Sequence, residues 1–352
     1  MGLPTNHPLV SGKTTQSAVV QALSGVRQIT PPIWFMRQAG RSLPEYRKIR
    51  EGISMLDSCL RPELASEITL QPVRRHSVDA GIFFSDIVIP LKLAGVDVTI
   101  VSNVGPVLNS PVQNRSDFTK LQMLDLESLK PIAQAVSMAT AELDTTPLLG
   151  FGGAPFTLAS YLIEGKPSQD IPVSRAMMKE EPELWSDILN WCAEITAAFL
   201  RTQIIAGVSA IQVFDSWAGR LTKVEYIQFA APHTKTVMDL ISDLPVARIA
   251  FGVGTKSILK EMYETGATAI GVDSQTPLSE ASEILGGKVP LQGNIDPELL
   301  LGPWDELKRA TDTAIESGKS APSHVLNLGH GVLPNTNPQM ITRLVDYVHG
   351  VS

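Results

Sequence analysis

Short runs of apolar residues recur along this chain, and most of them end at a glycine or a polar residue. The runs show no strict alternation of apolar and polar side chains, which is typical of strands buried on both faces of a parallel sheet. The pattern predicts eight strands, over residues 33–36, 80–84, 147–151, 210–214, 247–251, 267–272, 288–292 and 325–328.

Amphipathic stretches that predict helices separate most of these strands. One helix begins at residue 62, and others are predicted over 183–206, 224–241, 256–263, 278–285, 304–317 and 338–349. Eight strand–helix units in one chain predict an α/β fold, a single closed (β/α)8 barrel of the TIM type. A doubly wound open sheet is the alternative, but the glycine-rich fingerprint that usually follows its first strand is missing.

The spacing of the predicted elements is uneven after the second strand. Residues 96–101 alternate like a hairpin strand and residues 120–143 have the pattern of an amphipathic helix, so we predict a hairpin and helix insertion there. We expect residues 1–15 to form a flexible N-terminal arm. Residues 16–352 are expected to form one barrel domain, because no repeat or low-complexity linker marks a boundary.

Charge and composition argue against several classes of protein. The net charge is −7 and no cluster of Lys or Arg occurs, so we expect no nucleic-acid partner. No apolar run approaches the roughly 20 residues that span a bilayer, and no signal pattern opens the chain, so we expect a cytoplasmic protein. Cys59 and Cys192 lie outside any Cys-x-x-Cys or Cys/His cluster, which argues against a disulfide framework or structural zinc.

Residues with chemical potential occur where the predicted strands end, which is the end at which barrel enzymes place their active sites. Arg37 and Arg41 follow the first strand. A guanidinium fits a carboxylate or phosphate through two parallel hydrogen bonds, so the pair indicates a mouth for an anionic ligand. Two surface arginines around a turn would have the same pattern.

Four further residues near the predicted strand ends could have either a functional or a structural role. Asp86 lies in an apolar run, where an unpaired charge is too costly to keep, so it needs donors from protein or ligand. His330 lies between two glycines, which permit close approach of a ligand. Tyr161 falls about two turns into a predicted helix, a place that also suits a core tyrosine. Ser216 has no histidine near it in sequence, so no serine-hydrolase triad is indicated.

Separate motifs along nearly the whole chain resemble those of the uroporphyrinogen decarboxylase family. In chain order they are Met36–Arg41, Phe84–Ile87, Gly152–Leu158, Val213–Ser216, Gln292–Pro297 and Asn327–Gly331. The chain departs from the family at Ser42, where tyrosine is common, and at Trp217, where some members have histidine. Neither departure falls on a residue to which the resemblance assigns chemistry.

The resemblance implies a cofactor-free and metal-free barrel enzyme, generally a homodimer, that acts on an anionic tetrapyrrole. Four acetate side chains of uroporphyrinogen III would lose carbon dioxide and become methyl groups, giving coproporphyrinogen III. The catalytic residues implied are Asp86, Arg37 and Tyr161, and substrate would be bound by these three with Gln38, Arg41, Ser216 and His330.

Two other functions stay open at this point. One is a zinc- or corrinoid-dependent methyltransferase on the same barrel, which would bind zinc through histidine and cysteine at strand ends. Both cysteines fall in helical stretches, away from His330 in sequence, which counts against it. The other is a non-catalytic tetrapyrrole-binding barrel, which the loss of Arg37, Asp86 or Tyr161 would have favoured.

Overall fold

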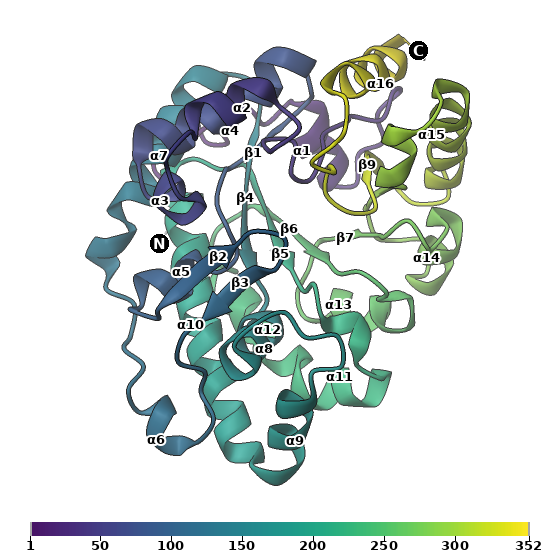
Figure 1. Cartoon of the computed structure of the whole chain (residues 1–352). Coiled ribbons are helices and arrows are strands. Elements are labelled where there is room, and N and C mark those ends of the chain that lie inside the picture. The colour runs from purple at the N-terminus through teal and green to yellow at the C-terminus, as the bar shows by residue number, and fades with distance from the viewer. Residues whose placement is uncertain (1, 351–352) are drawn as a thin grey trace.

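A curled parallel sheet of seven strands forms the centre of the molecule (Figure 1), in a computed structural model that describes residues 2–350. The strands pair in the order β1-β4-β5-β6-β7-β8-β9, which follows the chain. Their bounds are β1 Gly81–Ile82, β4 Leu148–Gly153, β5 Ala210–Phe214, β6 Ala247–Phe251, β7 Ala269–Gly271, β8 Leu291–Ile295 and β9 His324–Leu328. Their carboxyl ends therefore meet at one edge of the sheet.

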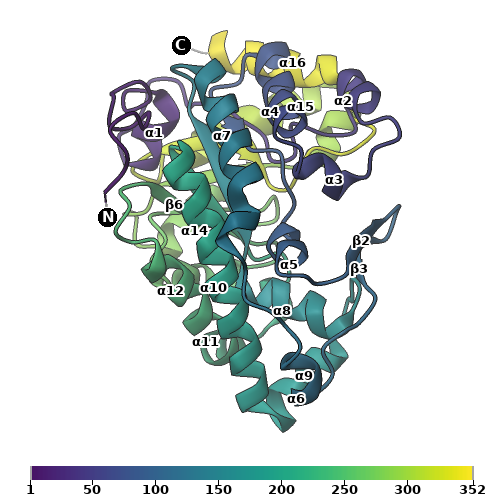
Figure 2. The same cartoon turned by 90° about the vertical axis from the view of Figure 1, so that its left-hand side faces the viewer.

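Helices flank the sheet on its outer side (Figures 1 and 2), as parallel strands joined by crossovers require. Many begin with proline in the first turn, where its missing N–H costs nothing. The α-helices are α1 Ala18–Leu23, α2 Pro44–Ile49, α3 Met55–Cys59, α4 Pro62–His76, α5 Ile89–Leu93, α6 Arg115–Phe118, α7 Lys130–Leu143, α8 Pro155–Glu164, α9 Pro172–Glu180, α10 Pro182–Ala206, α11 Lys223–Phe229, α12 Ala231–Leu240, α13 Leu259–Glu264, α14 Leu278–Ile284, α15 Trp304–Gly318 and α16 Pro338–Gly350. Short 3₁₀ helices are η1 Leu126–Leu129, η2 Ala218–Arg220, η3 Lys256–Ile258 and η4 Pro297–Leu301. Within residues 2–350, no helix is both long and apolar enough to cross a membrane.

The first predicted strand is reduced to a single parallel bridge between Ile33 and Leu326. Pro32 has no N–H to give to a ladder, but its carbonyl accepts the Leu326 N–H at 2.8 Å. On the other side, the N–H of Asp79 donates to the Ile33 carbonyl at 2.8 Å. Residues 32–36 thus lie between the edge strands β9 and β1 as an irregular segment, where the sequence predicted the first of eight strands.

The predicted helix over 224–241 is divided into α11 and α12. Ala230 leaves the helical conformation, with φ −125° and ψ −51°, and Pro232 follows in the first turn of α12. A proline inside one continuous helix would remove a hydrogen bond and clash with the preceding turn, so the chain starts a new helix instead.

An insertion separates β1 from β4. It contains α5, a two-stranded antiparallel hairpin of β2 (Val98–Val101) and β3 (Gly105–Leu108), then α6, η1 and α7. Figure 2 shows the hairpin projecting from the body near α8. Its base is tied to the end of α8, because the Leu108 N–H donates to the Gly165 carbonyl at 2.7 Å.

The first residues pack against the body, in contrast to the flexible arm expected for residues 1–15. His7 is buried, with Nε2 3.0 Å from the Ile204 carbonyl, and the Thr14 hydroxyl lies 2.8 Å from that of Ser209. Ser209 immediately precedes β5, so this segment covers the amino ends of the strands, opposite the candidate site. Turns without apolar periodicity gave no signal of this packing.

Candidate active site

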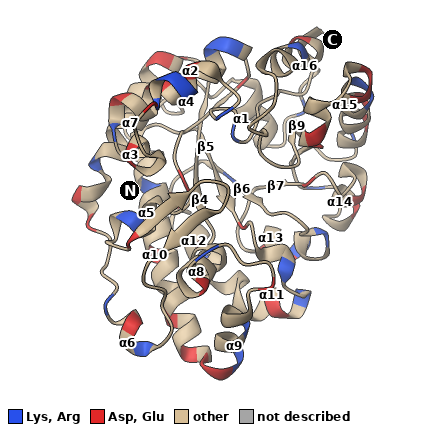
Figure 3. Cartoon of the chain, in the orientation of Figure 1, with Lys and Arg blue, Asp and Glu red and all other residues tan. Residues whose placement is uncertain are grey.

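Charged residues lie mainly in the outer helices and the loops, while the strands are almost free of them (Figure 3). Arg248 in β6 is the one Lys, Arg, Asp or Glu within the strands of the described region. The charged groups that can act on a ligand therefore come from the loops at the carboxyl ends of the strands.

The turn that carries Arg37 is held by the end of β9 and the loop after it. The Met36 N–H donates to Asn327 Oδ1 at 3.1 Å, and the Met36 carbonyl accepts the Val332 N–H at 2.9 Å. Arg37 itself has the left-handed φ of 59°, which turns its side chain out of the extended segment. Its guanidinium is exposed and forms no ion pair with any residue of 2–350.

Gln38 lies beneath this turn and has no exposed surface. Its Oε1 accepts the Phe35 N–H and its Nε2 donates to the Ala80 carbonyl, each at 3.0 Å. Both ends of the amide are therefore used by the fold. In the structure Gln38 supports the Arg37 turn, and the substrate-binding role that the resemblance implied for it stays a prediction.

The charge of Arg37 acts on three of the other predicted residues. Burial raises the pKa of Asp86, while the Val88 N–H and Arg37 oppose that rise. Burial, with a smaller effect from the Asp86 charge, raises the pKa of Tyr161 to about 12. Loss of water around the ring, together with Arg37, lowers the pKa of His330. The four side chains are thus within electrostatic reach of one another through Arg37.

Arg41 and Ser216 are exposed and stand apart from this group. The Arg41 carbonyl accepts a hydrogen bond from the Arg47 guanidinium at 2.6 Å, so the turn after Arg37 is closed locally. No polar partner of the Ser216 hydroxyl appears among the hydrogen bonds of the described region. Both side chains are free to meet a ligand from the loops that carry them.

The glycines beside His330 are required by the protein itself. A Cβ at Gly331 would lie 2.4 Å from Cδ of Arg37 and 2.6 Å from its Cγ. A Cβ at Gly329 would lie 2.1 Å from the backbone nitrogen of Ser274. The sequence predicted close approach of a ligand here, and the close approach seen is that of Arg37 and of a neighbouring loop.

Asp215, at the end of β5, is a residue to which the sequence assigned no role. Its Oδ1 accepts the Thr157 hydroxyl at 2.7 Å, and its Oδ2 is buried without a partner in the described region. Burial raises the pKa of Asp215 to about 7. The Thr157 oxygen also accepts the Trp217 N–H at 3.3 Å, so this carboxyl joins the Ser216 loop to α8, which carries Tyr161.

Three phenylalanines form an apolar layer at the ends of β4, β5 and β6. The ring centroids of Phe151 and Phe214 are 5.5 Å apart, and those of Phe214 and Phe251 are 5.7 Å apart. Phe214 shares a face of β5 with Gln212, which accepts a hydrogen bond from Gln292 across the interior at 2.8 Å. The sequence signal was available, since Phe214 and Phe251 end β5 and β6 before Asp215 and Gly252, and Phe151 precedes the last two glycines of β4.

No metal-binding group can be assembled from the residues that the structure describes. No three His, Cys, Asp or Glu side chains of 2–350 come together as metal ligands would. Cys59 and Cys192 are buried in α3 and α10, where burial raises the pKa of both thiols.

Comparison with known proteins gives consistent relatives. A family model described as uroporphyrinogen decarboxylase (URO-D) matches residues 14–351. A protein of that name from Arthrobacter sp. (strain FB24) is 54% identical, over 97% of this chain and 99% of its own length. Another, from Leifsonia xyli subsp. xyli (strain CTCB07), is 49% identical over 99% of this chain and 98% of its own length.

Among solved structures, a methyltransferase from Methanosarcina mazei superposes with a TM-score of 0.80. It covers 96% of this chain and is itself covered to 98%, at 18% sequence identity. At that identity the likeness concerns the fold alone.

The two glycines beside His330 should respond differently to alanine. Gly331→Ala meets the Arg37 side chain, whose Cδ and Cγ can shift although its Cβ lies only 3.0 Å away, so we expect a loss of unfolding free energy of about 1–2 kcal/mol. Gly329→Ala meets backbone, which cannot move cheaply, and should lose about 3 kcal/mol or more. Urea denaturation of both variants measures this, and equal losses would contradict the packing described.

Asp215 should make stability depend on pH. Its folded pKa of about 7 exceeds the ordinary 3.8, so between these values the folded chain holds a proton that the unfolded chain has lost. The stability from that proton is complete below the unfolded pKa and is lost as pH rises through about 7. Asp215→Asn mimics the protonated form. Between pH 4 and 8 its free energy of unfolding should rise relative to that of the wild type by up to about 4 kcal/mol.

The measurement is the free energy of unfolding of both proteins at several pH values across that range. A difference between them that stays flat with pH would show that Asp215 is ionised in the folded chain.

Proposed function

Because this chain belongs to the uroporphyrinogen decarboxylase family and is therefore a carboxy-lyase of porphyrin biosynthesis, we propose that its substrate is uroporphyrinogen III and its product coproporphyrinogen III. The observation that carries this proposal is the electrostatic group of Arg37, Asp86 and Tyr161, in which the arginine has no ion-pair partner in the described chain. We also propose that the protein is a cytoplasmic homodimer and that residues 32–36 complete the seven-stranded sheet to a closed (β/α)8 barrel.

The substrate's carboxylates account for the free arginines. Uroporphyrinogen III carries eight carboxylates around one macrocycle, so a cleft that receives it needs fixed cations. Arg37 and Arg41 are exposed and can each offer the planar fork that fits a carboxylate. The chain as a whole carries a net charge of −7, so attraction of the substrate depends on this local positive field.

Decarboxylation requires a place for the electron pair that the departing carbon dioxide leaves behind. Protonation of a pyrrole α-carbon makes the ring cationic, and the ring then takes up the pair as the acetate C–C bond breaks. A second proton adds to the resulting methylene carbon to form the methyl group, and the proton on the α-carbon is released. Acid, base and charge balance without an oxidant or reductant.

Asp86 is suited to stabilise the cationic ring. Its carboxylate would accept hydrogen bonds from pyrrole N–H groups and hold the macrocycle by its centre. Burial raises the pKa of Asp86, so the charged form is poorly solvated and gains strongly from a cation or N–H donors. A fixed carboxylate in a site of low dielectric costs no reorganisation as positive charge develops.

The other groups fit binding roles better than proton transfer. Tyr161, with a pKa of about 12, keeps its hydroxyl proton and can donate a hydrogen bond to a carboxylate. His330, with a lowered pKa, is neutral at pH 7. Arg37 is a poor acid because a guanidinium keeps its proton. A bound water or a substrate carboxyl is therefore the proton donor that we propose.

Loss of the Asp86 carboxylate should abolish most turnover. Asp86→Asn keeps an acceptor for the Val88 N–H but removes the charge, and we expect kcat to fall about 100-fold or more. The assay follows the product porphyrins by chromatography after oxidation, with Asp239→Asn on α12 as a matched surface control. Near wild-type single-turnover rates in Asp86→Asn would refute this role, and an inactive wild type would favour the non-catalytic tetrapyrrole-binding barrel.

Arg37→Lys keeps the charge and loses the fork. Because a carboxylate would then be held by one donor group instead of two parallel hydrogen bonds, we expect kcat/KM to fall about tenfold or more. Arg201→Lys is the control, since Arg201 binds Asp243 through two hydrogen bonds of 2.7 Å on the surface. An unchanged kcat/KM in Arg37→Lys would contradict bidentate binding by this residue.

A further inference from the structure

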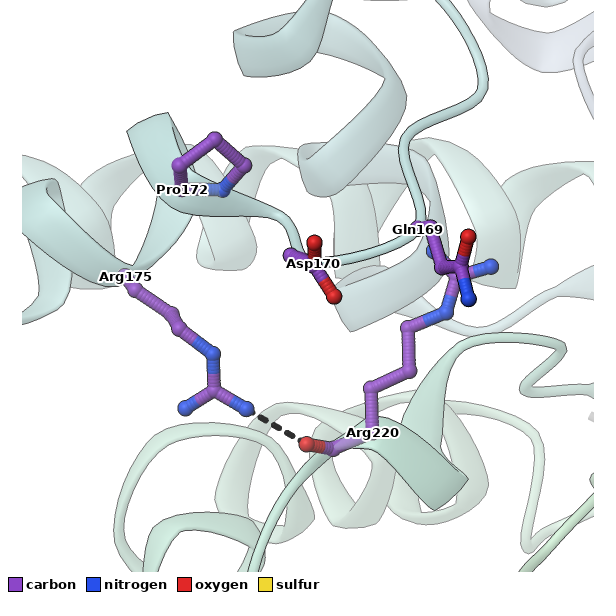
Figure 4. Close-up of a pocket in the computed structure, with 5 residues that line it drawn as sticks. All are labelled: Gln169, Asp170, Pro172, Arg175 and Arg220. Atoms are coloured by element: carbon purple, nitrogen blue, oxygen red, sulfur yellow. Dashed lines mark hydrogen bonds between the residues drawn. The ribbon is translucent and has the colours of Figure 1, made fainter.

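A cavity of about 670 Å³ lies beside the candidate site, at the start of α9 and the loop after β5. Figure 4 shows its lining residues, Gln169, Asp170, Pro172, Arg175 and Arg220. The function proposed above makes no use of this cavity.

The two arginines in its wall differ in what they bind. Arg175 forms an ion pair with Glu225 at 2.5 Å and also donates to the Arg220 carbonyl. Arg220 donates to the Ser168 carbonyl, and it forms no ion pair with any residue that the structure describes. Arg175 is therefore neutralised by the protein, whereas the charge of Arg220 has no such partner.

Aromatic stacking joins Arg220 to the candidate site. Its guanidinium carbon lies 4.5 Å from the ring centroid of Trp217, and the Trp217 ring lies 4.5 Å from that of Tyr161. The stacking holds the cation in one place and withdraws part of it from water. Arg220 and Tyr161 thus both lie against the Trp217 ring, which links Arg220 to the candidate site.

The charges that face Arg220 are few. Burial lowers the pKa of Arg220, and the carboxylates of Asp170 and Glu164 oppose this. Glu164 is engaged by the Ser174 N–H at 2.8 Å. Asp170 lines the same cavity but forms no ion pair with Arg220 in the described chain. A cation that is partly withdrawn from water and unpaired gains most from an anion that enters the cavity.

We propose that Arg220 is a further substrate-binding residue, which takes a carboxylate of a pyrrole other than the one that reacts at Asp86. This inference rests on the proposed function. The substrate has more carboxylates than Arg37 and Arg41 can hold, and the cavity offers room for a side-chain carboxylate beside an unpaired cation. Arg220 meets the site through Trp217 and Tyr161, and the carboxylates that act on it are Asp170 and Glu164 and not Asp86, so we assign its contribution to binding and not to the reacting bond.

The test compares Arg220→Gln and Arg220→Lys in steady-state decarboxylation. Arg220→Gln should raise KM about tenfold and weaken inhibition by the coproporphyrinogen product to a similar degree, because a charge-assisted hydrogen bond is lost. Its kcat should stay within about twofold of wild type. Because Arg220 already donates to the Ser168 carbonyl, it offers a carboxylate its charge and not the full fork, so Arg220→Lys keeps the charge and should recover most of the affinity.

A matched control is Arg343→Gln. Arg343 on α16 is also stacked on a tryptophan, with its guanidinium carbon 4.1 Å from the ring centroid of Trp304 on α15. It should leave KM and kcat unchanged. Equal losses in Arg220→Gln and Arg220→Lys would instead assign Arg220 to support of the Ser168 loop and overturn the proposal. So would an unchanged KM in Arg220→Gln in an active enzyme, whereas an inactive wild type would refute the proposed function itself.

Discussion

The hydrogen bond from the Met36 N–H to Asn327 Oδ1 is the interaction on which the candidate site depends most. Residues 32–36 form one bridge where an eighth strand was predicted, so the ladder alone cannot fix the direction in which Arg37 leaves the sheet. Asn327 is fully buried in β9, and Gln38 supports the same turn from below. The direction of Arg37 is thus set by two buried amides: Gln38 uses both ends of its amide, and Asn327 Oδ1 accepts the N–H groups of Met36 and Leu328.

Sequence pattern predicted the regular part of the fold well, because buried parallel strands are apolar along their whole length. The strands over 210–214 and 247–251 were predicted with their observed bounds. The failures have local causes in proline: Pro32 has no N–H to give to a ladder, and Pro232 divides one predicted helix into two. In the site, charge and position after a strand pointed to Arg37, Asp86 and Asp215 as strand-end residues. They gave no information on the buried hydrogen bonds of Gln38 and Asp215, since burial of a polar side chain depends on neighbours that are distant in sequence.

Whether an arginine of this chain forms an ion pair depends on whether a carboxylate lies near it. A protein with a net charge of −7 has carboxylates available for most of its cations, and Arg74, Arg75, Arg175 and Arg201 are paired with Glu or Asp. Arg37 follows the irregular segment between β9 and β1, and the strands of the described sheet contain no Asp or Glu that could pair with it. An arginine left without a partner in such a place retains its full capacity for an incoming anion.

Asp215 shows how a carboxyl can be tolerated next to a mouth that receives carboxylates. In its charged form it would repel the substrate and would leave Oδ2 without a donor. With a pKa of about 7, a large fraction of Asp215 is protonated at neutral pH, and the arrival of further negative charge raises that fraction. The same carboxyl still binds Thr157, which holds the Trp217 backbone and so the ring between Tyr161 and Arg220. A residue that supports the binding loop thereby avoids opposing the charge that the loop is positioned to receive.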